Sequence, residues 1–166
     1  RDIVFVAKGE FSKVPFAGWY GALKGHIFVD RSNPTGAQYT MMRAAEKLKH
    51  RPRSVVIFPE GTYFKDGGIR PFRPGGAVLA IGTGMEVVPI AINSEANIDN
   101  LLITGTWKNP LRVIIGKPFS VEGKTYDDRY DVAKQTRDAV LDLIGTGGSP
   151  SSGVNGNAPD QERVEA

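Results

Sequence analysis

The chain alternates short runs of apolar residues with longer segments in which apolar side chains recur every three or four positions. The runs are rich in β-branched residues, as expected of strands that are buried on both faces of a sheet. They occupy residues 3–7, 26–31, 54–58, 87–92 and 111–116. The periodic segments predict helices over residues 36–50, 77–81 and 127–144.

This order of elements predicts an α/β protein with a mostly parallel open sheet flanked by helices, because strands joined by helices pair in parallel through right-handed crossovers. We expect the fold to be organised around residues 54–93, as a strand, loop, helix and strand of the βαβ kind. Pro74 is expected at the first position of that helix, and Gly82 and Gly84 at its end.

Length and composition predict one domain at residues 1–145 and a disordered polar tail at residues 146–166, where Gly, Ser, Asn and Pro dominate. The net charge is +3, and the tail carries three acids against one base, so the body carries +5. A mildly basic body suits phosphates or an anionic membrane surface. There are no cysteines for disulfides or thiolate metal sites, and two histidines offer little to a metal.

The chain contains no apolar run that approaches the roughly 20 residues needed to span a bilayer, and no signal peptide. It begins without methionine, directly in a strand-like run. We therefore expect a fragment whose N-terminal part is missing.

Residues 11–23 bring aromatic side chains onto one face of an expected helix. Three aromatic residues and a leucine follow the spacing i, i+3, i+4 and i+7: Phe16, Trp19, Tyr20 and Leu23. We expect this face to pack on the sheet. The alternative is contact with lipid or with an acyl chain.

Charged residues and a glycine follow two of the strands. Asp30 and Arg31 end one run, and Pro59, Glu60 and Gly61 end the next. We interpret the two strands as neighbours whose carboxyl ends meet at one edge, where open α/β sheets bind ligands. An arginine there suits a phosphate or carboxylate, Glu60 can accept from a hydroxyl or orient a neighbour, and Gly61 lets a ligand approach the backbone. Two simpler interpretations stay open: a plain Asp30–Arg31 ion pair and an ordinary Pro-Glu-Gly turn.

Three short motifs resemble those of the glycerolipid acyltransferase family, the 1-acylglycerol-3-phosphate acyltransferases. Residues 25–31, Gly-His-Ile-Phe-Val-Asp-Arg, resemble the family's second motif, and residues 58–62, Phe-Pro-Glu-Gly-Thr, match its third. Residues 87–91, Val-Val-Pro-Ile-Ala, are similar to the fourth. Ala7, Lys8 and residues 15–18 also resemble the segment before the second motif. The similarity covers about residues 1–120, and three motifs in register are a specific signal.

The resemblance implies a glycerol-3-phosphate acyltransferase-like α/β fold and an O-acyltransferase of phospholipid biosynthesis. It implies transfer of a fatty acyl group from acyl-coenzyme A or acyl carrier protein to the free hydroxyl of lysophosphatidate, giving phosphatidate. Arg31, Glu60, Gly61 and Thr62 are thereby assigned to the acceptor and its phosphate, and Pro89 to the acyl donor. The expected partners are lysophosphatidate, an acyl thioester and a membrane surface at its cytoplasmic face. No metal, nucleic acid or cofactor beyond the acyl-carrying co-substrate is expected.

The base of the family's reaction is absent from this chain. In the family, a His-x-x-x-x-Asp motif supplies the base that deprotonates the acceptor hydroxyl. The motif requires an aspartate five positions after the histidine. Here Asp30 lies four positions after His26, and the residue five positions after His50 is Val55. We therefore interpret both histidines as structural or surface residues, and we expect this chain by itself to be inactive.

The third motif continues with Tyr63 and Phe64 where family members often have Arg-Ser. Lys65 and Arg70 are the candidates to supply the missing positive charge. Which acceptor the chain prefers among closely related ones therefore stays open.

Other functions fit parts of the pattern. A non-catalytic phospholipid- or phosphate-binding module would keep the anchor residues and lack the base, whereas an unrelated sugar-phosphate enzyme would need a base that the chain does not have. A P-loop nucleotide site is disfavoured because no Gly-x-x-x-x-Gly-Lys-Ser/Thr sequence occurs. A His-x-x-x-x-Asp motif encoded upstream of Arg1 would favour the enzyme over the binding module.

Overall fold

The computed structural model of the chain describes residues 2–61, 68–94 and 111–146. Its elements, in chain order, are β1 (Ile3–Lys8), the 3-10 helix η1 (Gly9–Lys13), α1 (Ala17–Lys24), β2 (Ile27–Val29), α2 (Pro34–His50), β3 (Ser54–Val56), α3 (Gly75–Thr83), β4 (Ile90–Ser94), β5 (Leu111–Ile115), the 3-10 helix η2 (Tyr126–Asp128) and α5 (Arg129–Thr146). The expected fold class, a parallel sheet flanked by helices, is confirmed. Thr62, Lys65 and nearly all of the predicted tail lie outside the described residues.

The parallel sheet has the strand order β2-β1-β3. Val6 of β1 pairs with Ile27 of β2, and Val4 of β1 pairs with Val55 of β3. The interpretation of β2 and β3 as neighbours was therefore wrong. Helix α2 carries the chain past the central strand to its other side, and a pattern of apolar runs does not reveal on which side a crossover ends.

The expected βαβ unit at residues 54–93 is only partly present. β3 ends at Val56, two residues earlier than predicted, and β4 begins at Ile90 and pairs antiparallel with β5. Pro89 has no N–H to offer a neighbouring strand, but its carbonyl accepts a hydrogen bond from the backbone N–H of Gly116 at 2.9 Å. This bond extends the β4–β5 ribbon, so the second strand of the unit belongs to the ribbon and not to the parallel sheet.

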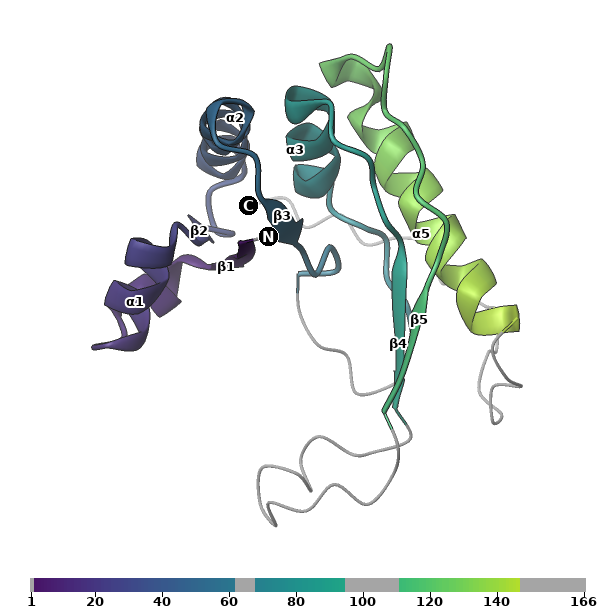
Figure 1. Cartoon of the computed structure of the whole chain (residues 1–166), viewed down its shortest axis with the longest axis horizontal. Coiled ribbons are helices and arrows are strands. Elements are labelled where there is room, and N and C mark those ends of the chain that lie inside the picture. Colours follow the sequence, from purple (N-terminus) through teal and green to yellow (C-terminus); the bar gives the residue numbers. More distant parts are fainter. Residues whose placement is uncertain (1, 62–67, 95–110, 147–166) are drawn as a thin grey trace, which may run out of the picture.

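Helices α2 and α3 lie side by side on one face of the parallel sheet, and α5 packs along α3 and the β4–β5 ribbon (Figure 1). The two helices approach closely, since a Cβ on Gly82 would lie only 2.8 Å from the Cβ of Ala45. The core between sheet, α2 and α3 comprises Ile27, Val29, Met41, Ala44, Ala45, Leu48, Val78 and Leu79. A second cluster joins α3 to α5 and comprises Ala77, Val121, Val132 and Ala133.

The opposite face of the sheet is open in the part of the chain that the structure describes. Val6 packs against the first cluster, and Val4, on the same face of β1, is 1% exposed. Ile3 and Phe5 alternate to the other face and are 53% and 42% exposed. The described helices therefore cover one face of this sheet.

The aromatic face of α1 does not pack on the sheet, so that expectation was wrong. The exposed fraction is 80% for Phe16, the N-cap of the helix, and 65%, 60% and 87% for Trp19, Tyr20 and Leu23. The buried residues of α1 are Gly18 and Gly21, and a Cβ on Gly21 would lie 2.9 Å from the ring of Phe28. The spacing did place the aromatic residues on one face, but the glycines allow the opposite side of the helix to approach its neighbours.

Phe16 has a backbone conformation that is rare for a residue with a side chain. Its φ of 62° makes it the one non-glycine residue with positive φ in the described part of the chain. The N–H of Ala17 donates to the carbonyl of Pro15 at 2.7 Å, which closes a γ-turn around Phe16. Such a turn is strained and persists only where the surroundings impose it. Here it holds an exposed aromatic ring at the start of α1.

None of the helices in the described ranges combines the length and the apolar composition needed to cross a bilayer.

Candidate functional site

The carboxyl ends of the three parallel strands meet at one edge of the sheet. Lys8 ends β1, Arg31 follows β2 by two residues, and Glu60 and Gly61 follow β3. The pairing of Lys8 with Val29 keeps the ends of β1 and β2 level. Because β1 lies between the other two, the tips that follow β2 and β3 are two strand spacings apart, roughly 10 Å.

Asp30 does not form an ion pair with the adjacent Arg31. Its Oδ1 accepts hydrogen bonds from the hydroxyl of Ser32 at 2.6 Å and from the Ser32 N–H at 2.9 Å. These two bonds hold the pKa of the Asp30 carboxyl below its ordinary value. No ion pair of Arg31 occurs among the described residues, so the half-buried guanidinium is available to an anionic ligand.

Lys8 is a further candidate for the site, which the sequence did not single out. It lies at the end of the central strand, between the two tips, and its Nζ is 2.7 Å from Oε2 of Glu10. The backbones are close here as well, since a Cβ on Gly9 would lie 3.4 Å from the backbone nitrogen of Asp30. The motif resemblance included this lysine, but only the strand order shows that it lies between the other site residues.

The turn after β3 is fastened to the segment that leads into α3. The N–H of Arg73 donates to the carbonyl of Pro59 at 2.9 Å, and Oε2 of Glu60 accepts from the N–H of Arg70 at 3.1 Å. Gly61 has a φ of 78°, which favours glycine. The sequence allowed Glu60 either to accept from a hydroxyl or to orient a neighbouring residue. Its bond to the N–H of Arg70 corresponds to the second role.

Arg137 of α5 holds the same segment from the other side. Its Nη2 donates to the carbonyl of Ile69 at 3.0 Å, and its Nε donates to the carbonyl of Arg70 at 3.2 Å. Hydrogen bonds from a charged donor are stronger than neutral ones. Arg137 therefore fixes the segment that orients Glu60, and no local sequence signal links residues so far apart.

The side chain of Arg73 lies against this turn. A Cβ on Gly61 would lie 2.9 Å from Nε of Arg73 and 3.2 Å from its Cδ, so the arginine side chain lies directly over the glycine. Arg70, one of the two cations expected to replace the missing charge, is held through its own backbone N–H and carbonyl. The other candidate, Lys65, lies outside the described residues, as does Thr62.

Pro89 is buried where the β4–β5 ribbon begins. A Cβ on Gly116 would lie 2.9 Å from Cγ of Pro89, so the two residues pack tightly. The side chains on either side, Val88 and Ile90, are 44% and 45% exposed. The same face of the ribbon exposes further apolar side chains, namely Ile92, Val113 and Ile115. An acyl chain near Pro89 would meet these neighbours and not the proline itself.

The two histidines have structural or surface positions. Nδ1 of His26 accepts from the N–H of Phe5 at 3.3 Å, and the two rings meet edge to face with centroids 5.5 Å apart. His50 is the last residue of α2 and is exposed. In the described part of the chain, no group of three or more His, Asp or Glu residues is placed to hold a metal ion.

A family model described as Acyltransferase matches residues 1–93, more than half of the chain. The chain belongs to the acyltransferase family. The motifs at residues 25–31 and 58–62 lie within the matched region, so the resemblance read from them is confirmed.

Curated relatives of this acyltransferase chain are longer than it is. The 1-acyl-sn-glycerol-3-phosphate acyltransferase of Haemophilus influenzae is 34% identical over 82% of the chain and 56% of that protein. The protein of the same name from Saccharomyces cerevisiae is 31% identical over 83% of the chain and 46% of that protein. The chain thus spans about half the length of these relatives.

A solved structure shows the same fold. The crystal structure of the 1-acyl-sn-glycerophosphate (LPA) acyltransferase PlsC from Thermotoga maritima matches with a TM-score of 0.58 at 24% identity. The match covers 90% of this chain and 58% of that one.

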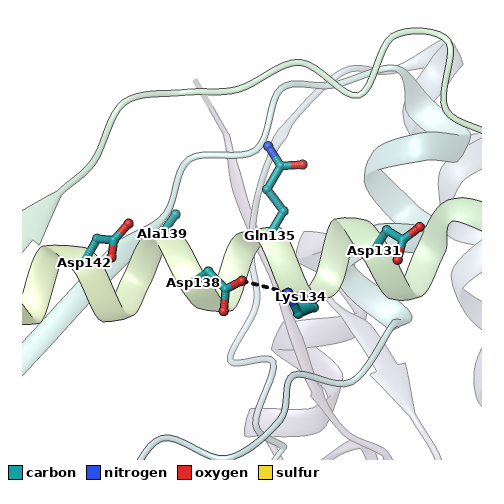
Figure 2. Close-up of a pocket in the computed structure, with 6 residues that line it drawn as sticks. All are labelled: Asp131, Lys134, Gln135, Asp138, Ala139 and Asp142. Atoms are coloured by element: carbon teal, nitrogen blue, oxygen red, sulfur yellow. Dashed lines mark hydrogen bonds and ion pairs between the residues drawn. The ribbon is translucent and has the colours of Figure 1, made fainter.

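Two concave regions of the acyltransferase lie away from the sheet edge. Figure 2 shows the first, a shallow hollow along α5, where Lys134 and Asp138 form an ion pair at 3.4 Å. Its lining comes from that helix alone: Asp131, Lys134, Gln135, Asp138, Ala139 and Asp142. A hollow lined by one exposed helix is a solvated surface, and we assign no ligand to it.

The second concave region is a groove of about 600 Å³ at the amino ends of the strands. Gly25, shortly before β2, and Arg53, just before β3, contribute to its lining. Helix α2 contributes Arg43 and Lys47, and Arg51 caps its C-terminus; the three follow one another at intervals of about one turn. No acidic residue lines the groove, so this end of the sheet presents a row of positive charges beside α1.

Proposed function

We propose that this acyltransferase transfers a fatty acyl group from acyl-coenzyme A or acyl carrier protein to the free hydroxyl of lysophosphatidate, giving phosphatidate. The observation that carries the proposal is Arg31 at the carboxyl end of β2, without an ion-pair partner in the described part of the chain. Lys8 pairs with the last residue of β2, and the glycine turn follows β3 on the other side of β1. The names of the relatives, which specify a 1-acyl-sn-glycerol-3-phosphate acceptor, support the same substrate class.

The reaction forms an ester bond between the acceptor oxygen and the thioester carbonyl carbon, and it breaks the bond between that carbon and sulfur. The hydroxyl proton passes to a base and finally to the departing thiolate. The described residues contribute positioning: Arg31 holds the phosphate, and Glu60 fixes the turn in which Gly61 leaves room for the side chain of Arg73. Holding the acceptor in place makes the attack effectively unimolecular. The exposed Val88 and Ile90 beside Pro89 are suited to the acyl chain of the donor.

The test is turnover of the full-length protein with and without Arg31. The Arg31→Ala protein is expected to show a raised acceptor KM and an unchanged donor KM, because a charged hydrogen bond to phosphate is lost. The loss is about 1.5–3 kcal/mol, the contribution of such a bond. Lys124→Ala, which removes an exposed charge elsewhere, is the control. An unchanged acceptor KM in a folded Arg31→Ala protein would reject the assignment.

A second candidate function is a phospholipid- or phosphate-binding module without catalysis. It is favoured by one observation, the absence of the His-x-x-x-x-Asp motif from these 166 residues. The same experiment separates the two. A full-length protein that binds lysophosphatidate but forms no phosphatidate from an acyl thioester would establish the binding module and reject the enzyme.

We propose further that the protein works at the cytoplasmic face of a membrane, with α1 as the contact surface. The four exposed apolar residues of α1 and the strained turn that holds Phe16 outward support this surface. Lys13 and Lys24 lie at the ends of the aromatic segment, and Ala22 of α1 lines the groove with the cationic row of α2. Apolar side chains that insert beside basic residues give reversible, salt-sensitive binding to anionic lipids.

Vesicle co-sedimentation tests this proposal. Leu23→Ser is expected to lower partitioning onto anionic vesicles about tenfold, since it removes an apolar side chain that would leave water. Leu141→Ser on α5 makes the same exchange at a site that is 37% exposed and should leave partitioning unchanged. Equal partitioning to neutral and anionic vesicles, or partitioning to neither, would contradict the proposal.

A further inference from the structure

The side chain of Arg73 lies over the turn of the third motif. Its Nε would be 2.9 Å, and its Cζ 3.6 Å, from a Cβ on Gly61. Gly61 thus satisfies two requirements at once, a φ of 78° and open space for the arginine. Any larger residue at this position would displace the guanidinium group.

Backbone hydrogen bonds set the position of the segment that carries Arg73. Its own N–H is bonded to the carbonyl of Pro59. Three residues earlier, Arg70 is bonded through its N–H to Glu60 and through its carbonyl to Arg137. The backbone that carries Arg73 is therefore held in place before any ligand binds, which lowers the entropic cost of binding.

The guanidinium group of Arg73 has no ion-pair partner among the described residues. Glu60, the carboxylate in this turn, accepts from the backbone N–H of Arg70. Arg73 itself is exposed. A fixed, exposed arginine at a ligand-binding edge is suited to an anion with several oxygens. Its planar fork matches phosphate through two parallel hydrogen bonds.

We propose that Arg73 is a second phosphate ligand of the acceptor, opposite Arg31, and that it makes the enzyme select acceptors that carry a phosphate. The proposal rests on the proposed acyl transfer to lysophosphatidate. Arg31 follows β2, and the side chain of Arg73 lies over the turn that follows β3. These two tips are separated by two strand spacings, roughly 10 Å, so one phosphate between them is within reach of both long side chains. Arg73 takes the role for which the sequence suggested Lys65 or Arg70.

The experiment compares two acceptors in the full-length protein: lysophosphatidate and the matching monoacylglycerol, which has the hydroxyl but no phosphate. Arg73→Gln is expected to lower kcat/KM for lysophosphatidate about 10- to 100-fold through a raised KM. It should leave turnover of monoacylglycerol and the KM of acyl-coenzyme A unchanged. Arg73→Lys keeps the charge without the fork and should lose less. Lys124→Ala is the control for loss of one positive charge.

Two other outcomes of this comparison of acceptors would overturn the proposal. Equal losses on both acceptors would mean that Arg73 only supports the turn. A raised KM for acyl-coenzyme A alone would place the arginine at the phosphates of the donor. Gly61→Ala provides a variant that keeps the arginine but displaces it, and it should impair lysophosphatidate more than monoacylglycerol.

A binding measurement separates failure of this proposal from failure of the proposed function. If the unmodified protein acylates neither acceptor, the proposed acyl transfer fails. Glycerol 3-phosphate is then titrated into the protein while the NMR signal of the Arg73 side-chain Nε–H is followed. A saturable shift that is absent from the Arg31→Ala protein would support the shared phosphate site, and no shift in the unmodified protein would overturn it.

Discussion

At the scale of single residues, hydrogen bonds from Ser32 to Asp30 take the place of an ion pair between Asp30 and its neighbour Arg31. The sequence allowed Asp30 and Arg31 to neutralise each other, but Ser32 supplies two closer donors within the same turn. The carboxylate is satisfied locally, and the arginine keeps its charge for a ligand. Removal of the Ser32 hydroxyl is therefore a direct test of the arrangement.

Replacing Ser32 with alanine is expected to raise the pKa of Asp30 toward its ordinary value of 3.8. The folded pKa is now depressed, so the bond stabilises the fold above the unfolded pKa and loses its effect as pH falls through the folded pKa. The stability difference between the unmodified and Ser32→Ala proteins should thus be full at neutral pH and vanish in acid. NMR titration of the Asp30 carboxyl carbon measures the shift, and the same pKa in both proteins would contradict this account.

Close helix packing decides how the elements are arranged. The parallel sheet, α2 and α3 share one core, and α5 joins them through α3 and through Arg137. Glycine at the α2–α3 contact and arginine at the α5–loop contact are the residues on which these junctions depend. Each junction gives a prediction at this scale.

Gly82→Ala should destabilise the fold because the added Cβ would lie 2.8 Å from the Cβ of Ala45. Overpacking of this kind costs about 1–3 kcal/mol. Gly145→Ala is the matched control, since nothing lies within 4 Å of a Cβ there and the change favours a helix. Urea unfolding measures both, and equal stability of the two variants would show that the α2–α3 contact adjusts without cost.

Arg137→Met should loosen the segment that orients Glu60 while leaving the helix intact. The carbonyls of Ile69 and Arg70 lose their charged donors, so the N–H groups of Arg70 and Arg73 are expected to exchange faster with solvent. In the full-length protein the acceptor KM should rise. Lys134→Met, on an exposed side of the same helix, is the control. Unchanged exchange at both N–H groups would show that the segment is held without Arg137.

At the scale of the whole molecule, the described residues supply binding groups but no positioned base. The 166-residue chain lacks the His-x-x-x-x-Asp sequence and cysteine, and His26 is engaged with the backbone of Phe5. A positioned base contributes about 10² to 10⁴ in rate. The chain is therefore expected to bind the acceptor without converting it.

Incubation of this 166-residue chain with labelled lysophosphatidate and acyl-coenzyme A should yield no phosphatidate above a boiled control. Weak binding of lysophosphatidate should persist, because Arg31 and the turn after β3 are present. Turnover that survives both His26→Ala and His50→Ala would show that the base lies elsewhere in the chain.

The sequence by itself determined most of the local elements and the family motifs. Apolar runs predicted β1 and β5 to within one residue, since burial imposes their composition, and the motifs indicated Arg31, Glu60 and Gly61 as candidates for the site. These features depend on residues that are close together along the chain. The same holds for the spacing that put the aromatic residues of α1 on one face.

Only the tertiary structure decided which elements meet. Strand order placed β1 and Lys8 between the two tips, and the glycines of α1 turned its aromatic face outward. Arg73 over Gly61 and Arg137 on the loop are contacts across 12 and more than 60 residues, for which local periodicity carries no signal. The physical reason is that secondary structure follows from neighbours along the chain, whereas a binding site follows from packing between segments that the chain brings together only when it folds.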